Sequence, residues 1–217
     1  MEKRADFDWL AGPYRWMEYF SFGPMLQRCR CAHLGRAAGA RKALVLGDGD
    51  GRFTRRLLLQ NPKVQVHAVD GSTAMLRAFL KRAGTNSGRV KTERADLREW
   101  VPDAAATDGK YDLVASHFFL DCLTTDEVCA LAGRVRKVVT PEAIWLVSEF
   151  SIPESRFGRF VARPLVWGLY WVFSRLTGLT VRTLPDHHSA LWSAGFALIE
   201  RRNLLFGLLV SEAWAAC

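Results

Sequence analysis

The sequence lacks the features that define several common classes of protein. Its five cysteines are an odd number and form no Cys-x-x-Cys pair, so we expect neither a disulfide framework nor a metal centre. The longest strongly apolar run, residues 164–173, is too short to cross a bilayer, which takes roughly 20 apolar residues. The first residues also lack the apolar core of a signal peptide. We therefore expect a cytoplasmic globular protein with reduced thiols.

Two phosphate-binding motifs are missing as well. No Gly-Lys-Ser or Gly-Lys-Thr tripeptide occurs, which excludes a Walker loop. The dinucleotide fingerprint Gly-x-Gly-x-x-Gly would need a third glycine at Arg52 or Thr54, so a nicotinamide cofactor is disfavoured. The formal net charge of +8 favours an anionic partner, but it does not distinguish a membrane leaflet, an acidic substrate and a nucleic acid.

Apolar runs and amphipathic stretches alternate along the centre of the chain, which is typical of parallel βαβ units. Strands are predicted at 42–46, 64–69, 90–95, 111–116 and 143–149, and helices at 52–60, 73–83 and 124–138. Outside this part we expect helices within 1–40, including one from 25 to 38, helical structure over 154–180, and a short helix at 187–194. Apolar runs at 196–201 and 205–213 are close enough for an antiparallel hairpin.

This pattern predicts a four-part α/β organisation. Residues 1–40 form an N-terminal helical cap and residues 41–153 the cofactor-binding core. Residues 154–186 form a helical, substrate-covering insertion, and residues 187–217 add the last helix and the C-terminal hairpin that completes the sheet.

The most informative stretch is a strand that ends in three alternating glycines, Gly47, Gly49 and Gly51. Without Cβ atoms, a ligand can press against the backbone N–H groups of such a turn. The next apolar run ends in Asp70, about 20 residues further on, where a carboxylate suits a ribose diol. Asp48 and Asp50 within the loop would repel a pyrophosphate but suit a ligand with positive charge. Together these residues predict an adenosine-bearing cofactor.

The glycines, with Asp70 and Ser72 in the stretch Val-Asp-Gly-Ser-Thr-Ala-Met-Leu, resemble the class I S-adenosylmethionine-dependent methyltransferases. The resemblance covers residues 40–152, and residues 146–153 are similar to the ubiquinone/menaquinone-biosynthesis type. It implies S-adenosylmethionine as the cofactor. It also implies an α/β, Rossmann-like fold, with a seven-stranded, mostly parallel sheet, an antiparallel last strand and helices on both faces.

The resemblance also implies roles for particular residues. Asp70 would bind the ribose, Asp96 and the Leu97 N–H the adenine, and His117 would lie beside the sulfonium. The full set of implied cofactor contacts is Tyr14, Gly47, Asp48, Gly49, Gly51, Asp70, Gly71, Ser72, Met75, Asp96, Leu97, Ser116 and His117.

Two positions depart from the family. Val45 stands where an acid is common, which leaves Asp48 or Asp50 to contact the cofactor ammonium. The segment 139–143 replaces a Pro-Gly-Gly turn. Several residues also have structural alternatives: Asp70 as a helix cap, Asp96 as the N-cap of residues 97–101, His67 as a core histidine and Asp112 as a strand-start acid.

Methyl transfer by in-line displacement needs an aligned acceptor and sometimes a base. His117 is the candidate base, or a residue that merely lines the cofactor pocket. His187 and His188 are alternative bases, although helix capping by Asp186 explains that segment equally well.

Aromatic and basic residues alternate in the insertion, which suits an apolar substrate or a face on anionic lipid, or alternatively a helix packed on its own core. The predicted substrate contacts are Phe118, Asp121, Trp167, Tyr170 and His187. Residues 116–119 lack the Asn/Asp-Pro-Pro-Tyr motif of enzymes that methylate amino groups of nucleobases, so DNA is not expected as a partner. We therefore expect methyl transfer to a small lipophilic acceptor, with peripheral membrane contact as a possible addition. The alternatives are an RNA or protein methyltransferase and a non-catalytic, cofactor-binding protein.

Overall fold

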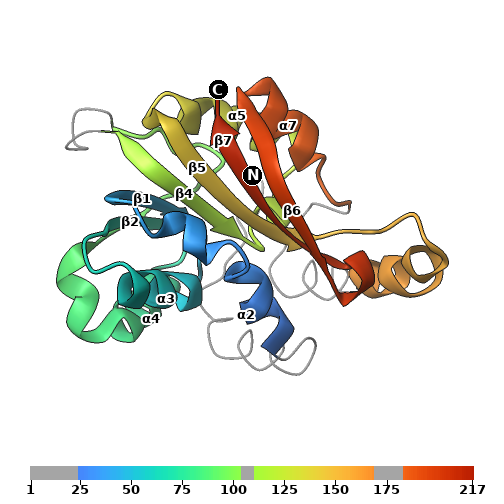
Figure 1. Cartoon of the computed structure of the whole chain (residues 1–217), viewed down its shortest axis with the longest axis horizontal. Helices are drawn as coiled ribbons and strands as arrows, with labels where there is room; N and C mark the ends of the chain where they lie inside the picture. The colour runs from blue at the N-terminus through green and yellow to red at the C-terminus, as the bar shows by residue number, and fades with distance from the viewer. Residues whose placement is uncertain (1–23, 104–109, 169–182) are drawn as a thin grey trace, which may run out of the picture.

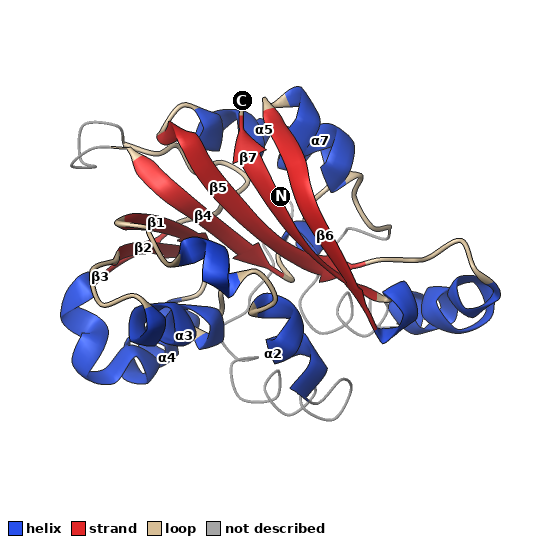
Figure 2. Cartoon of the chain, viewed as in Figure 1, coloured by secondary structure: helices blue, strands red, loops and turns tan. Residues whose placement is uncertain are grey.

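The computed structural model describes residues 24–103, 110–168 and 183–217, and its centre is one seven-stranded sheet between two layers of helices (Figure 1). The strand order is β3-β2-β1-β4-β5-β7-β6 (Figure 2). β7 is antiparallel to both of its neighbours, and the other pairings are parallel. The strands are β1 (Lys42–Leu46), β2 (Gln65–Asp70), β3 (Val90–Arg94), β4 (Tyr111–His117), β5 (Val139–Phe150), β6 (Phe196–Leu204) and β7 (Leu209–Ala216). The predicted fold class is confirmed.

The two faces of the sheet are covered by different helices. α2 (Pro24–Arg30), α3 (Arg52–Gln60) and α4 (Thr73–Ala83) lie on one face, and α5 (Thr125–Arg136) and α7 (His187–Ser193) on the other. β1 shows why both faces are apolar: Ala43 and Val45 face α3 and α4, whereas Leu44 and Leu46 face α5. Successive side chains of a strand point to opposite faces, so a parallel strand covered on both sides needs a continuous apolar run.

Polar side chains fix where the helices begin. The Ser72 hydroxyl accepts from the Met75 N–H at the start of α4, and Asp186 accepts from the Ser189 N–H at the start of α7. Thr124 and Glu127 form a reciprocal capping box at the start of α5. The sequence-predicted capping by Asp186 is thereby confirmed.

Three predicted boundaries were wrong by four residues or more. The helix expected over 25–38 ends at Arg30, because the chain turns to place the His33 Nε2 3.1 Å from the Ser211 carbonyl oxygen; a 3₁₀ turn, Leu34–Ala37, follows. β5 begins at Val139 rather than 143, since Val139 pairs with Tyr111 across an irregularity in β4. The last apolar run begins with a tight turn, Leu205–Gly207, and β7 starts only at Leu209.

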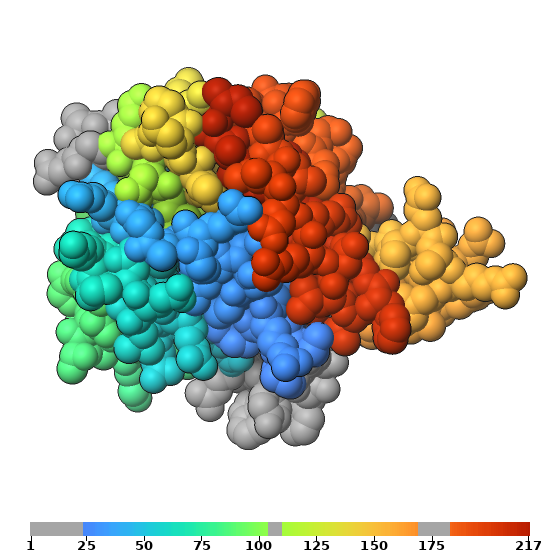
Figure 3. Space-filling view, viewed as in Figure 1, coloured from blue at the N-terminus to red at the C-terminus, as the bar shows by residue number. Residues whose placement is uncertain are grey.

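The described part of the insertion projects from the body of the molecule (Figure 3). It contains a π-helical turn, Gly158–Ala162, whose Ala162 packs with Val166 and Leu208. The Phe157 ring lies 5.4 Å from the ring of Phe206. Within the described segments, no helix has the length and apolar character needed to cross a membrane. The N-terminal cap up to residue 23, with Tyr14, and the segment with Tyr170 lie outside the described residues.

Candidate cofactor and acceptor site

The loops that follow β1, β2 and β3 meet at one edge of the sheet. The Gly47 N–H donates to the Val69 carbonyl oxygen at 2.9 Å, and the Ala95 N–H donates to the Asp70 carbonyl oxygen at 3.2 Å. The carboxyl ends of neighbouring parallel strands form this edge, where open α/β sheets bind their ligands. The predicted glycine loop, ribose acid and adenine segment are therefore neighbours in space.

All three loop glycines have left-handed backbone angles, with φ of +64° at Gly47, +55° at Gly49 and +79° at Gly51. A Cβ at Gly47 would strike the Phe119 ring, and one at Gly51 would strike the Phe79 ring. At Gly49, however, the Met75 Sδ, 3.9 Å away, is the one described atom that a Cβ would meet. The loop is therefore packed at its two ends and open in the middle, beside Gly49.

The two acids of the loop have different environments. One oxygen of Asp48, Oδ2, accepts from the N–H and the hydroxyl of Thr54 at 3.0 and 2.8 Å. The other oxygen, Oδ1, is buried and has no hydrogen-bond partner in the part of the chain that the structure describes. Burial raises the pKa of Asp48 to about 6, because desolvation penalises the carboxylate.

Asp50 fixes the loop to the adjacent helices. Its carboxylate pairs with Arg82 of α4 and with Arg52 of α3, and its carbonyl oxygen accepts from the Arg82 Nε at 2.8 Å. Of the two acids considered as replacements for the one missing at Val45, only Asp48 has an oxygen to spare. Val45 itself is buried against α3 and α4.

Asp70 and Ser72 form the next part of the edge. The Asp70 Oδ1 accepts from the Ser72 N–H at 2.8 Å, while the Ser72 hydroxyl caps α4. Ser72 therefore does the capping that was the alternative role for Asp70. Met75, one turn into α4, is buried and lies closest to the opening at Gly49. Gly71 is exposed.

Asp96 follows β3 and has a local structural role. Its Oδ1 accepts from the Arg98 N–H at 3.0 Å, and its carbonyl oxygen accepts from the Trp100 N–H at 2.8 Å. The alternative prediction, that Asp96 caps the turn after it, therefore describes its present contacts. Leu97 is buried in the core, so only its backbone is available to a ligand.

Ser116 and His117 end β4 and point to opposite faces of the sheet. The Ser116 hydroxyl accepts from the Trp145 indole N–H at 2.9 Å, which commits its side chain to the core. The His117 Nδ1 lies 3.0 Å from the Ser148 hydroxyl, and its ring lies 4.3 Å from that of Phe53. Its Nε2 is buried without a hydrogen-bond partner among the described residues. Burial holds the pKa of His117 well below the usual value, so the ring is neutral at pH 7.

Arg30 of α2 is a site residue that sequence reasoning missed. Its guanidinium lies 5.1 Å from the centre of the Phe118 ring, and its charge lowers the pKa of both Asp48 and His117. Arg30 is buried although it is charged. It comes from a helix before the glycine loop, and no motif marks it.

The loop after β4 is held by a second residue that sequence reasoning missed, Glu149. Its Oε1 accepts from the N–H groups of Phe119 and Leu120 at 3.2 and 2.8 Å. These two bonds secure a strained turn, since Phe118 has a φ of +55°. Burial raises the pKa of Glu149 well above its usual value and that of neighbouring Asp121 to about 6. Asp121 is thus a half-buried carboxyl group whose charge raises the pKa of buried Glu149 further.

The remaining predicted residues have less direct relations to this edge. His187 contacts Glu212 of β7, and its charge acts on Asp121. Trp167 is 67% exposed on the projecting insertion. His67 lies 2.6 Å from the Tyr111 hydroxyl, as a core histidine would, and Asp112 accepts from the backbone of Arg41 and Lys42. The structural roles predicted for His67 and Asp112 are therefore confirmed.

The arrangement suits a ligand that carries an ammonium and a carboxylate on one end and a ribose on the other. Asp48 offers a carboxylate oxygen, Arg30 a guanidinium, and Asp70 a carboxylate at the end of the next strand. The opening at Gly49 lies in the loop that leads from β1 into α3. These groups fit S-adenosylmethionine.

Comparisons with known proteins agree with this geometry. Residues 43–142 match the family model described as a methyltransferase domain. The segment that contains the glycine loop, Asp70 and β4 is therefore similar in sequence to methyltransferase domains. No curated protein sequence matches the chain. The similarity of residues 146–153 to the ubiquinone type stays a prediction.

Solved structures share the fold at low sequence identity. An O-methyltransferase family protein from Burkholderia thailandensis is 20% identical with a TM-score of 0.68, and the match covers 89% of this chain and 55% of that one. The apo form of the S-adenosylmethionine-dependent methyltransferase SibL is 20% identical with a TM-score of 0.69, covering 99% and 62%. The N-methyltransferase NodS from Bradyrhizobium japonicum, solved with S-adenosyl-L-homocysteine, is 14% identical with a TM-score of 0.63, covering 88% and 87%. The chain thus spans little more than half the length of the first two.

Proposed function

We propose that this protein is an enzyme that transfers a methyl group from S-adenosylmethionine to a small acceptor. The observation that carries the proposal is the glycine loop. Among the described residues it is open at Gly49, next to an oxygen of Asp48 that has no partner there, and Asp70 lies on the same edge of the sheet. The cofactor, when bound, supplies an electrophilic methyl group on a sulfonium.

The proposed cofactor contacts divide by charge. Asp48 would accept from the ammonium and Arg30 would pair with the carboxylate of the methionyl part. Asp70 would hold the ribose diol, with Gly71, Ser72 and Met75 beside it. Asp96 and the backbone of Leu97 would meet the adenine. Ser116 contributes through its backbone, because its hydroxyl is already bonded to Trp145.

The acceptor would lie against the loop that follows β4. Phe118 packs on Phe150 with ring centres 5.3 Å apart, which supports an apolar wall there. Asp121, whose pKa is about 6, is suited to accept a proton from an acceptor hydroxyl or amine near neutral pH. His117 is neutral and has an Nε2 without a described partner, so it is the second candidate base. His187 would contribute indirectly, because its charge lowers the pKa of Asp121.

We also propose that the acceptor is lipophilic and that the protein contacts a membrane surface. Their support is a set of exposed apolar residues on the insertion and the neighbouring turn, interleaved with exposed arginines: Phe160, Val161, Leu165, Trp167 and Phe206, with Arg156, Arg159 and Arg163. This mixture is typical of surfaces that rest on anionic lipid. Flotation with anionic vesicles tests it, and the protein remaining at the bottom of the gradient would refute the membrane contact.

Two measurements test the enzymatic proposal. Calorimetry with S-adenosylhomocysteine should give one site per chain, and absence of heat with folded protein would overturn it. Incubation with methyl-labelled cofactor and a lysate divided into lipid, small-molecule, RNA and protein fractions should label a small molecule. Label in RNA or protein would refute the small acceptor, and binding without any transfer would favour a non-catalytic protein.

A further inference from the structure

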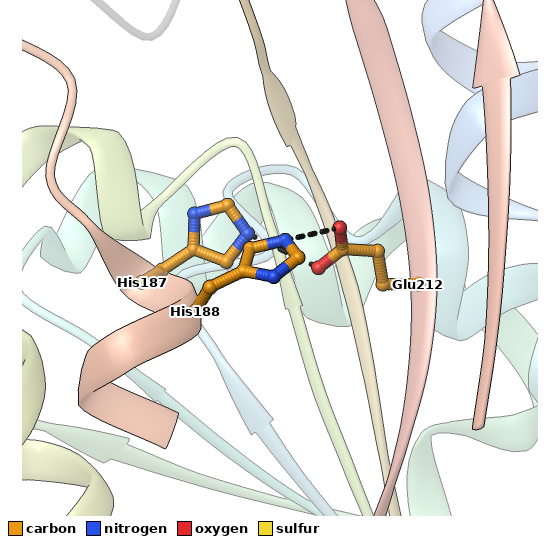
Figure 4. A group of neighbouring side chains, drawn as sticks. All are labelled: His187, His188 and Glu212. Carbon is orange, nitrogen blue, oxygen red and sulfur yellow. Dashed lines mark hydrogen bonds and ion pairs between the residues drawn. The ribbon is translucent and has the colours of Figure 1, made fainter. Parts of the chain in front are cut away.

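A second polar cluster lies on the opposite face of the sheet from α3, where α7 meets β7. His187 and His188, the first two residues of α7, both direct their rings at the carboxylate of Glu212 (Figure 4). The His187 Nε2 lies 3.1 Å from one oxygen, and the His188 Nε2 lies 2.7 Å from the other. Glu212 is completely buried, so its charge depends on these neighbours.

The cluster is held on regular elements rather than on a loop. Asp186 caps α7, and its own N–H donates to the Thr125 hydroxyl of α5 at 3.0 Å, which fixes the start of the helix. The Trp214 indole N–H donates to the Glu212 Oε2 at 3.1 Å. An outer hydrogen bond of this kind orients a carboxylate that serves as a metal ligand.

Two imidazoles and one carboxylate are the donor set of many divalent transition-metal sites. The three ligand atoms lie within 4.8 Å of one another, and the two measured nitrogen–oxygen separations are 3.1 and 2.7 Å. Donors on a tetrahedral ion with bonds of about 2.0–2.1 Å lie roughly 3.4 Å apart. Small side-chain rotations would therefore bring the three residues to one ion. His188 is about one-third exposed, which leaves a path for the ion and for a water ligand.

Arg201 of β6 occupies part of the place that an ion would take. Its Nη1 lies 3.5 Å from the Glu212 Oε1 and 3.3 Å from the His188 Nε2. Arg201 is partly exposed, and its Nε already bonds the Asn203 side chain at 3.2 Å, so the guanidinium can turn outward. Asp121 and Asp186 also interact with His187, and their negative charges favour a cation.

We propose that His187, His188 and Glu212 form a binding site for one divalent transition-metal ion, which displaces Arg201. The ion would join α7 to β7 and replace the guanidinium as the countercharge of Glu212. The inference does not rest on methyl transfer, because none of the three ligands belongs to the glycine-loop edge.

Titration of the chelator-treated full chain with Co²⁺ tests the proposal. Binding of one ion per chain should produce the visible absorption of tetrahedral cobalt, and Zn²⁺ should displace it. His188→Ala should weaken binding at least tenfold, or His188→Gln if the alanine variant does not fold by circular dichroism. Ser193→Ala, one turn further along the same helix, should bind like the wild type.

Arg201→Ala gives the sharpest outcome. Removing the competing cation should tighten Co²⁺ binding several-fold, whereas a purely structural ion pair predicts loss of folding stability and no gain in metal affinity. Three results would overturn the site: no uptake by the wild type, unchanged binding in the His188 variant, or the charge-transfer absorption of thiolate ligation alone, which would assign the metal to the cysteines.

Discussion

Two buried carboxylates of this protein, Asp48 beside the glycine loop and Glu212 beside α7, have opposite environments. Asp48 has one oxygen bonded to Thr54 and one without a described partner, and burial raises its pKa to about 6. Both oxygens of Glu212 receive hydrogen bonds, and its histidine partners hold its pKa far below the usual range. Asp48 therefore has an oxygen available for a ligand. Glu212 already has a partner at each oxygen, so a metal ion would bind there by replacing the Arg201 guanidinium.

The largest effect is expected from breaking the complete site. Glu212→Gln in metal-free buffer should lower the free energy of unfolding by about 3 kcal/mol, because it removes the buried carboxylate charge that His187, His188 and Arg201 contact. Urea unfolding measures this. The control is Glu200→Gln on β6, whose exposed pairs with Arg36 and Arg202 should matter little. Equal losses of unfolding free energy in the two variants would show that the buried Glu212 is no more important for stability than the exposed Glu200.

Gly49→Ala should weaken S-adenosylhomocysteine binding about 100-fold, or roughly 2.7 kcal/mol, by placing a Cβ in the opening of the loop. The matched control is Gly84→Ala. Gly84 has φ +58° against +55° at Gly49, and open space around it. Both variants should lose at least about 1 kcal/mol of stability, because a Cβ is strained at positive φ. Gly84→Ala should lose more, since the ψ of −127° at Gly84 lies outside the left-handed helical region. Only Gly49→Ala should lose binding. Calorimetry and urea unfolding separate the two effects.

Asp48→Asn should weaken cofactor binding about 30-fold, or about 2 kcal/mol, the magnitude of a charge-assisted hydrogen bond. The same change should raise the Tm at pH 8. A folded-state pKa raised from 3.8 to about 6 means that ionising Asp48 costs stability, and that this cost grows as the pH rises from about 4 to 6 and is complete above pH 6. The Tm difference should therefore shrink as the pH falls below 6 and vanish only near pH 4. If Asp48→Asn binds the cofactor as tightly as the wild type, Asp48 is not a cofactor contact.

The smallest effect is the pH dependence of binding. Since the carboxylate form of Asp48 binds the ammonium, affinity should fall about tenfold from pH 7 to pH 5, as the group with a pKa of about 6 takes up a proton. Asp48→Asn should flatten this slope. Asp121 has a similar pKa, so Asp121→Asn is the necessary control and should leave the slope of cofactor binding unchanged.

The sequence predicted the parallel part of the sheet because buried strands flanked by turns and helices leave a strong local pattern. Residues 43–46 are apolar on both faces and then stop at Gly47, so both the strand and the loop were evident. Boundaries set by tertiary contacts were not evident. β5 starts four residues early because Val139 pairs with Tyr111, and the helix before β1 ends early because His33 reaches β7.

The site residues likewise fall into those that a local motif predicts and those that only the tertiary structure brings to the site. Asp70 and the glycines lie within one continuous motif, and the structure brings them together. Arg30, Glu149 and Glu212 come from α2, β5 and β7, far from that motif in the chain, and a lone acidic or basic residue in a helix or strand has no distinguishing spacing. The packing of Phe119 against Gly47 also depends on a strained turn that no local propensity predicts.

The shared use of Asp48 has a dynamic consequence. One of its oxygens holds the amide of Thr54 in the first turn of α3, while the other faces the proposed ammonium. The Thr54 amide and the cofactor would therefore hold the same carboxylate through different oxygens, so that each contact restrains the group for the other. The amide proton of Thr54 should exchange with deuterium more slowly when the loop is occupied, which would make it a reporter of occupancy.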